Sequence, residues 1–303
     1  LNGLLYFCTA DRALVFDRQR ATPWGVKRPT RQPTITTAAF GFIRGTVQIA
    51  ITYKDASGKE SGSPPSKSIT KNNDVGLVLS GFDPPEGGST CIYVSQIGST
   101  TMYLAGETTG SSFTILRPGD PRKRPLQNQS DRPPPVGHIV RAFKGGLLIA
   151  QGSTVWRTQP MRPHTVDPQR GFFFYPERVT AIAPVENAVF VSADRTYRLA
   201  SLDVEPTQDV VYSGQIVEGS VVTSSDGSAR WLTEDGYVQA SPDGVITNIA
   251  QDRFAPLHAE FAPSGEVQYD GRSMMVSTLK GRPRNNALAS TDFIQAEVIR
   301  HAP

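Results

Sequence analysis

Side chains that could carry catalytic or ligand-binding chemistry are few in this sequence and widely spaced. The four histidines stand at none of the short spacings that zinc sites use: His138, His164, His258 and His301. Phosphate-binding glycine loops and a Gly-x-Ser-x-Gly nucleophile elbow are absent from the sequence. Glu177 could pair with Asp194 or Glu186 for glycoside hydrolysis, but chain spacing does not select such a pair, because the carboxyl groups must lie about 5–10 Å apart in space. We therefore predict no catalytic residue, no cofactor-binding residue and no metal ligand.

Basic residues gather in a proline-rich stretch near the middle of the sequence. The run comprises Arg117, Arg122, Lys123, Arg124 and Arg132. Cationic side chains contact phosphate groups, so Arg122, Lys123 and Arg124 are candidate phosphate contacts. Aromatic residues, which a single-strand binding surface would need for stacking, are not interleaved among them. The stretch is therefore predicted to be a solvated linker, with weak contact to DNA or to an acidic partner surface as the other interpretation.

Aromatic residues concentrate in one run, Phe172, Phe173, Phe174 and Tyr175. In a β-strand, successive side chains point to opposite faces, so alternation would bury two of these rings and expose two. Exposed aromatic residues often mark contacts between proteins. The four residues are therefore predicted to contribute to the core and to a protein interface.

The composition is that of a folded protein rich in short strands and turns. The 303 residues are 38% hydrophobic and 19% charged, and they include 27 Gly and 24 Pro, as expected where tight turns join strands. A net charge of +3 gives no global field for binding nucleic acid. No apolar run approaches the ~20 residues of a membrane span. The sequence begins with Leu1 and not with Met, already within a strand pattern, which is typical of a fragment.

Five stretches repeat one pattern, in which an apolar strand leads through a short polar turn into a second apolar strand. They are residues 3–16, 146–156, 188–199, 229–238 and 273–279, the last with only its first strand clear. Repeated hairpins of this kind indicate a radial β architecture such as a propeller. The predicted fold is therefore all-β, with function in surfaces and loops.

The hairpin pattern is interrupted, which sets the predicted domain boundaries. Residues 34–116 show the strand spacing of an immunoglobulin-like or fibronectin-III-like sandwich, and residues 117–135 follow as the basic linker. Residues 1–26 would then join residues 136–284 in one propeller-like domain.

Helix signals are confined to the C-terminal part of the sequence. Residues 285–303 form a predicted tail with a short helix over residues 293–300, because Ser290 or Thr291 could cap its N-terminus. Residues 252–261 are a weaker helix candidate, since Pro256 would break them near the start.

The segment from Ser224 to Trp231 resembles the Asp-box turn of sialidase-type propellers. In that turn Ser, Asp and Gly shape a hairpin and Trp packs beneath it, as Asp226, Gly227 and Trp231 would here. Ser228 and Arg230 depart from the pattern, at positions that usually hold Gly and Thr. The resemblance implies a structural hairpin and no activity.

Longer stretches resemble virion structural proteins of tailed bacteriophages. The residues that carry the resemblance are 51–62, 137–158, 174–199 and 286–300, which extend over most of the chain after residue 45. More loosely, the sequence is similar to tail nozzle or tail-tube-associated proteins of short-tailed phages. The resemblance implies a ring of identical chains in the virion tail, contacts with other tail proteins, and a lumen through which DNA passes without specific binding.

Two other functions stay open at this point. The first is a receptor-binding or carbohydrate-binding propeller on the virion surface, which would show Trp24, Trp156 or Trp231 as an exposed platform. The second is a glycosidase or sialidase of the propeller type, which would need carboxylates and arginines that converge in one cleft. The first hypothesis remains a structural component of the tail, with no enzymatic activity.

Overall fold

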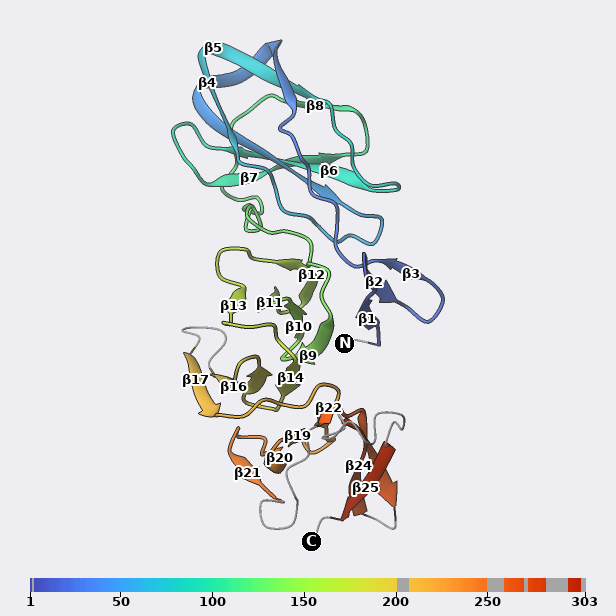
Figure 1. The fold of residues 1–303 in the computed structure, drawn as a ribbon. Coiled ribbons are helices and arrows are strands. Elements are labelled where there is room, and N and C mark those ends of the chain that lie inside the picture. The colour runs from blue at the N-terminus through green and yellow to red at the C-terminus, as the bar shows by residue number, and fades with distance from the viewer. Residues whose placement is uncertain (2, 201–206, 250–258, 270–271, 282–293, 301–303) are drawn as a thin grey trace. The chain divides into compact units, whose positions relative to one another are not determined.

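The computed structural model of the chain is built of β-strands and turns (Figure 1), which confirms the all-β prediction. It describes residues 1, 3–200, 207–249, 259–269, 272–281 and 294–300. Across these residues no helix occurs, and hence none that could cross a membrane.

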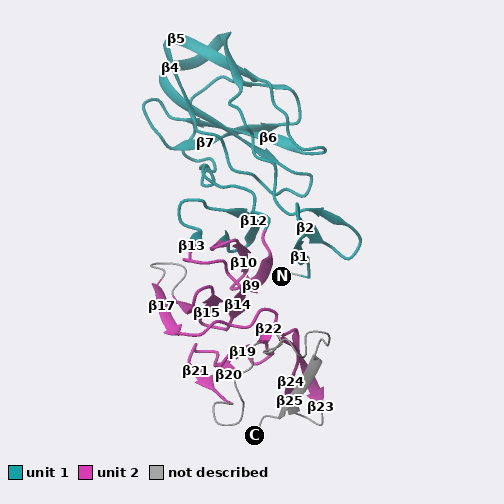
Figure 2. Ribbon diagram, in the orientation of Figure 1, with its two compact units in different colours: residues 1–136, 157–172 teal, residues 137–156, 173–303 magenta. Residues whose placement is uncertain are grey.

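The chain divides into two compact units (Figure 2). Unit 1 contains residues 1–136 and 157–172, and unit 2 contains residues 137–156 and 173–303. Residues 1–26 belong to unit 1 in this division. Their grouping with residues 136–284 in one propeller-like domain stays a prediction.

Unit 1 begins with a small antiparallel sheet in the order β1-β2-β3. Its strands are β1 (Leu5–Cys8), β2 (Ala13–Phe16) and β3 (Ala21–Pro23). The first two strands are the first predicted hairpin, which is confirmed. Trp24 follows β3, is buried, and donates a hydrogen bond from its indole Nε1 to the carbonyl oxygen of Pro163 at 2.5 Å. This contact ties the N-terminal sheet to residues 157–172 of the same unit.

A five-stranded sheet makes up most of unit 1, in the order β7-β6-β4-β5-β8. Its strands are β4 (Thr34–Lys54), β5 (Lys67–Ser80), β6 (Ser89–Ser95), β7 (Met102–Thr108) and β8 (Ser112–Ile115). The long strand β4 pairs with β5 and also with β6, and the sheet curls around it (Figure 1). The predicted sandwich strands therefore form one curled sheet.

Strand β4 is buried on both faces in its second half. Ile49, Ile51 and Tyr53 enter the main core of the sheet, whereas Ala50 packs in a second cluster on the other face. Strand β6 repeats this alternation, with Ile92 in the main core. Cys91 and Tyr93 of β6 join Ala50 in the second cluster, so both faces of the sheet are covered at this point.

Residues 117–135 cover the second face of the curled sheet. The amide of Leu126 donates to the carbonyl oxygen of Met102 at 2.8 Å, and the side chain of Asn128 donates to the carbonyl oxygen of Ser61 at 2.6 Å. Asn128 and Asp131 are both buried. Part of the segment thus finds partners on the sheet for its backbone and polar groups, whereas Arg122 and Lys123 are exposed. The assignment of residues 117–135 as a linker stays a prediction.

The remaining strands form four antiparallel sheets. The first contains β9 (Ile139–Phe143), β10 (Gly146–Gln151), β11 (Thr154–Gln159) and β12 (Arg162–Val166), with β13 (Phe172–Phe174) paired to β11. The second contains β14 (Ala181–Pro184), β15 (Val189–Ser192), β16 (Thr196–Ala200) and β17 (Thr207–Tyr212). The third contains β18 (Val222–Thr223), β19 (Ala229–Thr233), β20 (Gly236–Ala240) and β21 (Ile246–Asn248). The fourth contains β22 (Ala259–Phe261), β23 (Ser264–Tyr269), β24 (Arg272–Gly281) and β25 (Ile294–Arg300).

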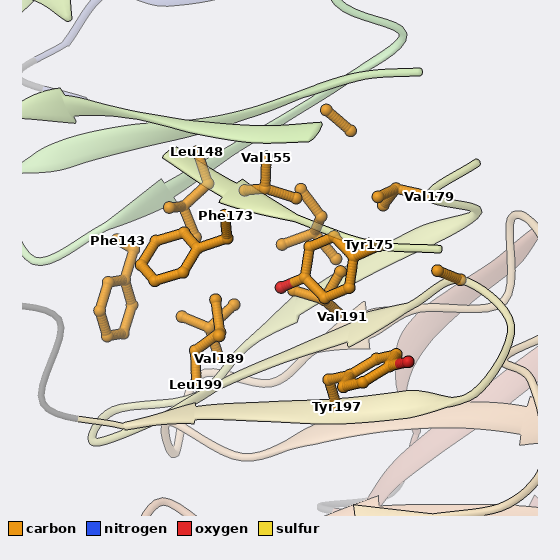
Figure 3. Close-up of a cluster of buried hydrophobic side chains, with 13 residues drawn as sticks. Phe143, Leu148, Val155, Phe173, Tyr175, Val179, Val189, Val191, Tyr197 and Leu199 are labelled. Carbon is orange, nitrogen blue, oxygen red and sulfur yellow. The ribbon is translucent and has the colours of Figure 1, made fainter. Parts of the chain in front are cut away.

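Neighbouring sheets of unit 2 share their hydrophobic cores. Val189 and Val191 of β15 pack with residues such as Leu148 and Tyr175 (Figure 3). Phe190, between them, points to the other face of its sheet and meets the buried ring of Trp231, with 5.3 Å between ring centroids. Each central sheet is therefore covered on both sides by its neighbours.

The third and fourth sheets continue this arrangement. Trp231 and Val238 pack toward the second sheet, while Leu232 and Tyr237 join a cluster with Met275 of β24. The hairpins β10–β11, β15–β16 and β19–β20 confirm three more of the predicted repeats, and β24 is the fifth predicted strand.

The predicted C-terminal helix is wrong where the structure describes it. Residues 294–300 form strand β25, which pairs with β24 along its whole length. Ile294, Ala296 and Val298 alternate with polar residues, a period of two that suits a strand. Of the second helix candidate, residues 252–258 lie outside the described residues, and residues 259–261 are strand β22.

Gly62 gives a direct test of how closely residues 117–135 pack on the curled sheet. A Cβ atom at this position would overlap the carbonyl oxygen of Asp131. We expect Gly62→Ala to lower the free energy of unfolding by about 1–3 kcal/mol, because the backbone of the covering segment must shift. Gly265→Ala is the control, since nothing lies within 4 Å of its added Cβ. Urea unfolding of both variants measures the difference, and equal stability would contradict the packing described.

Candidate interaction surfaces

The aromatic run alternates between the interior and the surface, as predicted. Phe173 and Tyr175 are buried, whereas Phe172 is 43% and Phe174 is 65% exposed. The ring of Tyr175 meets that of Tyr197 edge-on, with 5.1 Å between centroids (Figure 3). The two buried rings anchor strand β13, and the exposed rings remain the interface candidates.

The three candidate phosphate contacts have different surroundings. Arg122 is exposed and forms a two-point ion pair with the carboxylate of Asp120, with both nitrogen–oxygen distances 3.1 Å. Lys123 is exposed. Arg124 lies over the ring of Tyr93 and pairs with Glu60, with 2.8 Å between Nη2 and Oε2. The structure thus brings Arg124 into a side-chain network on the curled sheet.

Glu60 is the centre of that network. Its buried Oε1 accepts hydrogen bonds from the hydroxyl of Tyr93 at 2.7 Å and from Oγ1 of Thr52 at 2.5 Å. Arg124 also donates to the Tyr93 hydroxyl. Because donors surround the carboxylate, its negative charge is tolerated inside the protein. The network fastens residues 117–135 to the sheet with a charge pair.

The hydroxyl of Tyr93 and the thiol of Cys91, both near Glu60, stay protonated at neutral pH. Burial, and next the hydrogen bond to Glu60, raise the pKa of Tyr93 above its usual value. Burial, with a further contribution from the charge of Glu60, raises the pKa of the Cys91 thiol to about 11. Cys91 is a buried free thiol, and it is therefore not a thiolate nucleophile.

The histidines do not gather into a site within the described residues. His164 is buried in unit 1, and His138 of unit 2 contacts the carbonyl oxygen of Val179 through Nε2 at 2.7 Å. His258 and His301 lie outside the described residues. Over the described part of the chain, no group of three or more His, Cys, Asp or Glu residues could hold a metal ion.

The turn before β19 has the structure that its Asp-box resemblance implies. The Asp226 carboxylate accepts hydrogen bonds from the amide of Ser228 at 2.9 Å and from its hydroxyl at 2.6 Å. Gly227 has a positive φ of 82°, and Trp231 is buried. These contacts form a hairpin connection, and they present no reactive group.

An exposed pair of phenylalanines on β4 was not identified from the sequence. Phe40 is 65% and Phe42 is 50% exposed, and their ring centroids lie 5.4 Å apart at an interplanar angle of 76°. The guanidinium of Arg117 lies 5.2 Å from the centroid of the Phe42 ring, and Leu116 beside it is also exposed. We call these four residues the Phe40–Phe42 patch.

Gly41, the residue between the two phenylalanines, explains why both rings point into solvent. Gly41 is buried, and an added Cβ there would overlap the backbone of Val75 and Gly76. The opposite face of β4 therefore meets neighbouring backbone at this point, and Phe40 and Phe42 share the outer face. The spacing Phe-Gly-Phe is the sequence signal that could have predicted the patch.

A small pocket of about 220 Å³ lies where the first strands of the unit 2 sheets approach one another. Its lining includes Arg141 of β9, Thr180 next to β14, Glu218 before β18 and Phe261 of β22. Backbone bonding joins two of these segments, since the amide of Ala262 donates to the carbonyl oxygen of Glu218 at 2.8 Å. Residues in or next to the first strands of four successive sheets thus line one pocket.

Comparison with known proteins gives no assignment of family. No family model matches the chain, and no curated protein matches it. Among solved structures, the chain is similar to the extracellular domain of the putative one component system BT4673 from B. thetaiotaomicron, at 11% identity and a TM-score of 0.31. The match covers 90% of this chain and 35% of that one, so the chain spans about a third of its length.

His164 predicts an acid sensitivity of unit 1. Burial lowers the pKa of His164 to about 4, and Arg162 adds to the shift. Between the usual value of 6.5 and about pH 4, the unfolded chain binds a proton that the folded chain does not. Stability should therefore fall as the pH falls through this window, by up to about 1.4 kcal/mol per pH unit.

The variant His164→Gln should lose this part of the pH dependence, whereas His138→Gln in unit 2 should retain it. Urea unfolding at a series of pH values, followed through the indole NMR signal of Trp24, reports on unit 1. A pH profile of His164→Gln that is parallel to that of the unchanged chain would contradict the prediction.

Proposed function

We propose that this chain is a structural component of a bacteriophage tail, where it forms a cyclic oligomer in or at the end of the DNA-ejection conduit. The observation that carries the proposal is the Phe40–Phe42 patch, because paired exposed rings on a sheet are typical of a protein interface. Phe172 and Phe174 add two more exposed rings. The sequence resemblance to tail proteins gives the kind of particle in which such contacts would form.

The proposal also assigns a fold to each group of sheets. We propose that the unit 2 sheets are blades of a propeller-like array and that the curled sheet is an immunoglobulin-like domain. The convergence of the first strands on one pocket supports the first assignment, since propeller blades surround a central channel. The alternating residues Ile49, Ile51 and Tyr53 of β4, which enter one core, support the second, since sandwich strands alternate in this way. The role would be assembly, with chemistry confined to contacts between proteins.

The charges fit a conduit through which DNA passes without specific binding. The net charge is +3, and Arg122 and Arg124 are already paired with Asp120 and Glu60. Such pairing leaves fewer cations to hold phosphate groups. DNA could then move along the lumen that we propose.

The alternative, a receptor-binding or carbohydrate-binding propeller on the virion surface, has less support. It would need an exposed aromatic platform, but Trp24 and Trp231 are each only 1% exposed. Trp156 is half-buried.

Electron microscopy of purified phage particles, with this chain located in the density, tests the proposal directly. We expect its density to form a ring around the tail axis. Density in a peripheral fibre would favour the alternative function. A chain that is absent from particles would overturn both.

The role of the Phe40–Phe42 patch can be tested on the purified chain. We expect Phe40→Thr with Phe42→Thr to weaken self-association by at least about tenfold, since truncation of central interface residues costs more than about 1 kcal/mol each. Threonine keeps the strand propensity of β4. Sedimentation over a range of concentrations measures the association.

Val245→Thr is the matched control, because Val245 is an exposed apolar residue outside the patch. It should associate like the unchanged chain. Unchanged association of the double variant, with an unchanged circular dichroism spectrum, would show that the patch is not the interface.

A further inference from the structure

Unit 1 contains an open cavity of about 710 Å³, within the range of small-molecule sites. Four segments that are distant in the sequence surround it. Arg28 follows β3, Ser63 and Pro65 precede β5, residues 126–132 belong to the covering segment, and Pro168 and Gln169 follow β12. We call this the Arg28–Arg132 cavity.

Backbone hydrogen bonds hold the walls of the cavity in place. Arg132 and Val166 exchange two bonds of 2.9 Å, which fasten the covering segment to β12. The amide of Ser63 donates to the carbonyl oxygen of Gln129 at 3.1 Å. The cavity is thus framed by paired backbone and not by isolated loops, so a ligand would meet a preorganised surface.

The lining carries positive charge that is not neutralised within the described part of the chain. Arg28 and Arg132 line the cavity, no carboxylate does, and neither arginine has an ion-pair partner among the described residues. The nearby Asp131 is buried and is paired with Arg162, with 3.4 Å between Oδ2 and Nη2. Two guanidinium groups in one cavity favour a ligand with phosphate or carboxylate oxygens.

Neutral hydrogen-bonding groups complete the lining. Gln127, Gln129 and Gln169 are among the lining residues, and their side chains form no hydrogen bond with other described residues. Amide groups both donate and accept, which suits the hydroxyl groups of a sugar. The lining has no aromatic ring, so nucleic-acid bases would have nothing to stack on.

We propose that the Arg28–Arg132 cavity binds a small sugar that carries an anionic group, either a phosphate or a carboxylate. The arginines bind the anionic group, and the glutamines bind the hydroxyl groups. The site lies within unit 1, and the proposal does not depend on the assembly of a tail.

Calorimetric titration of the whole chain tests the site with four probes. These are glucose 6-phosphate, glucuronate, inorganic phosphate and glucose. We expect glucose 6-phosphate or glucuronate to bind more tightly than inorganic phosphate and glucose, and the tighter of the two identifies the anionic group. Binding should weaken as salt rises, because the arginines are accessible to ions.

Arg28→Gln and Arg132→Gln should each reduce the association constant about tenfold, as expected for loss of one charge-assisted hydrogen bond. Arg31→Gln is the control, since Arg31 is exposed and does not line the cavity. Failure of both sugars to bind, binding of inorganic phosphate as tight as theirs, or equal binding by all variants would overturn the proposal.

Discussion

The structure depends on one constraint, which is that its central strands are apolar on both faces and must be covered twice. In unit 2, Val189 and Val191 face one neighbouring sheet while Phe190 faces the next. A single sheet of this kind would expose a full apolar face to water, at a cost of about 25 cal/mol for each Å². The repeated hairpins therefore stabilise one another only as a stack, and each sheet is structural support for the next.

In unit 1, a segment without regular strands covers the second face of the curled sheet. Residues 117–135 lack the regular strands of a second sheet, yet they cover Ala50 and Cys91 on the outer face of the curled sheet. The covering segment brings polar and charged groups with it, and these need partners once water is excluded. Glu60 supplies one partner by binding Arg124, and Arg162 pairs with Asp131. Composition alone does not show such contacts, because backbone bonding to neighbouring elements decides which parts of a segment are solvated.

Features that depend on nearby residues could be predicted from the sequence. Alternation placed the four rings from Phe172 to Tyr175 on the correct faces, and the turn around Asp226 follows from hydrogen bonds within a few residues. The hairpins are equally local. The helix prediction was wrong at residues 294–300, because the capping residues suggested a helix whereas pairing with β24 formed a strand. The Arg28–Arg132 cavity could not be predicted from the sequence, because the four segments that line it come together only in the fold.

The Phe40–Phe42 patch is where the constraint of double cover is not met within the described chain. Gly41 lies against Val75 and Gly76, so the inner face of β4 is closed there, while both rings on the outer face remain in solvent. Elsewhere on β4, Ala50 lies in a cluster that Leu126 of residues 117–135 helps to cover. The difference between these two parts of one strand is the absence of a covering segment, and a second protein surface could supply that cover. In the ring of identical chains that we propose, each chain would place this patch against a different surface of its neighbour, so every patch would be covered.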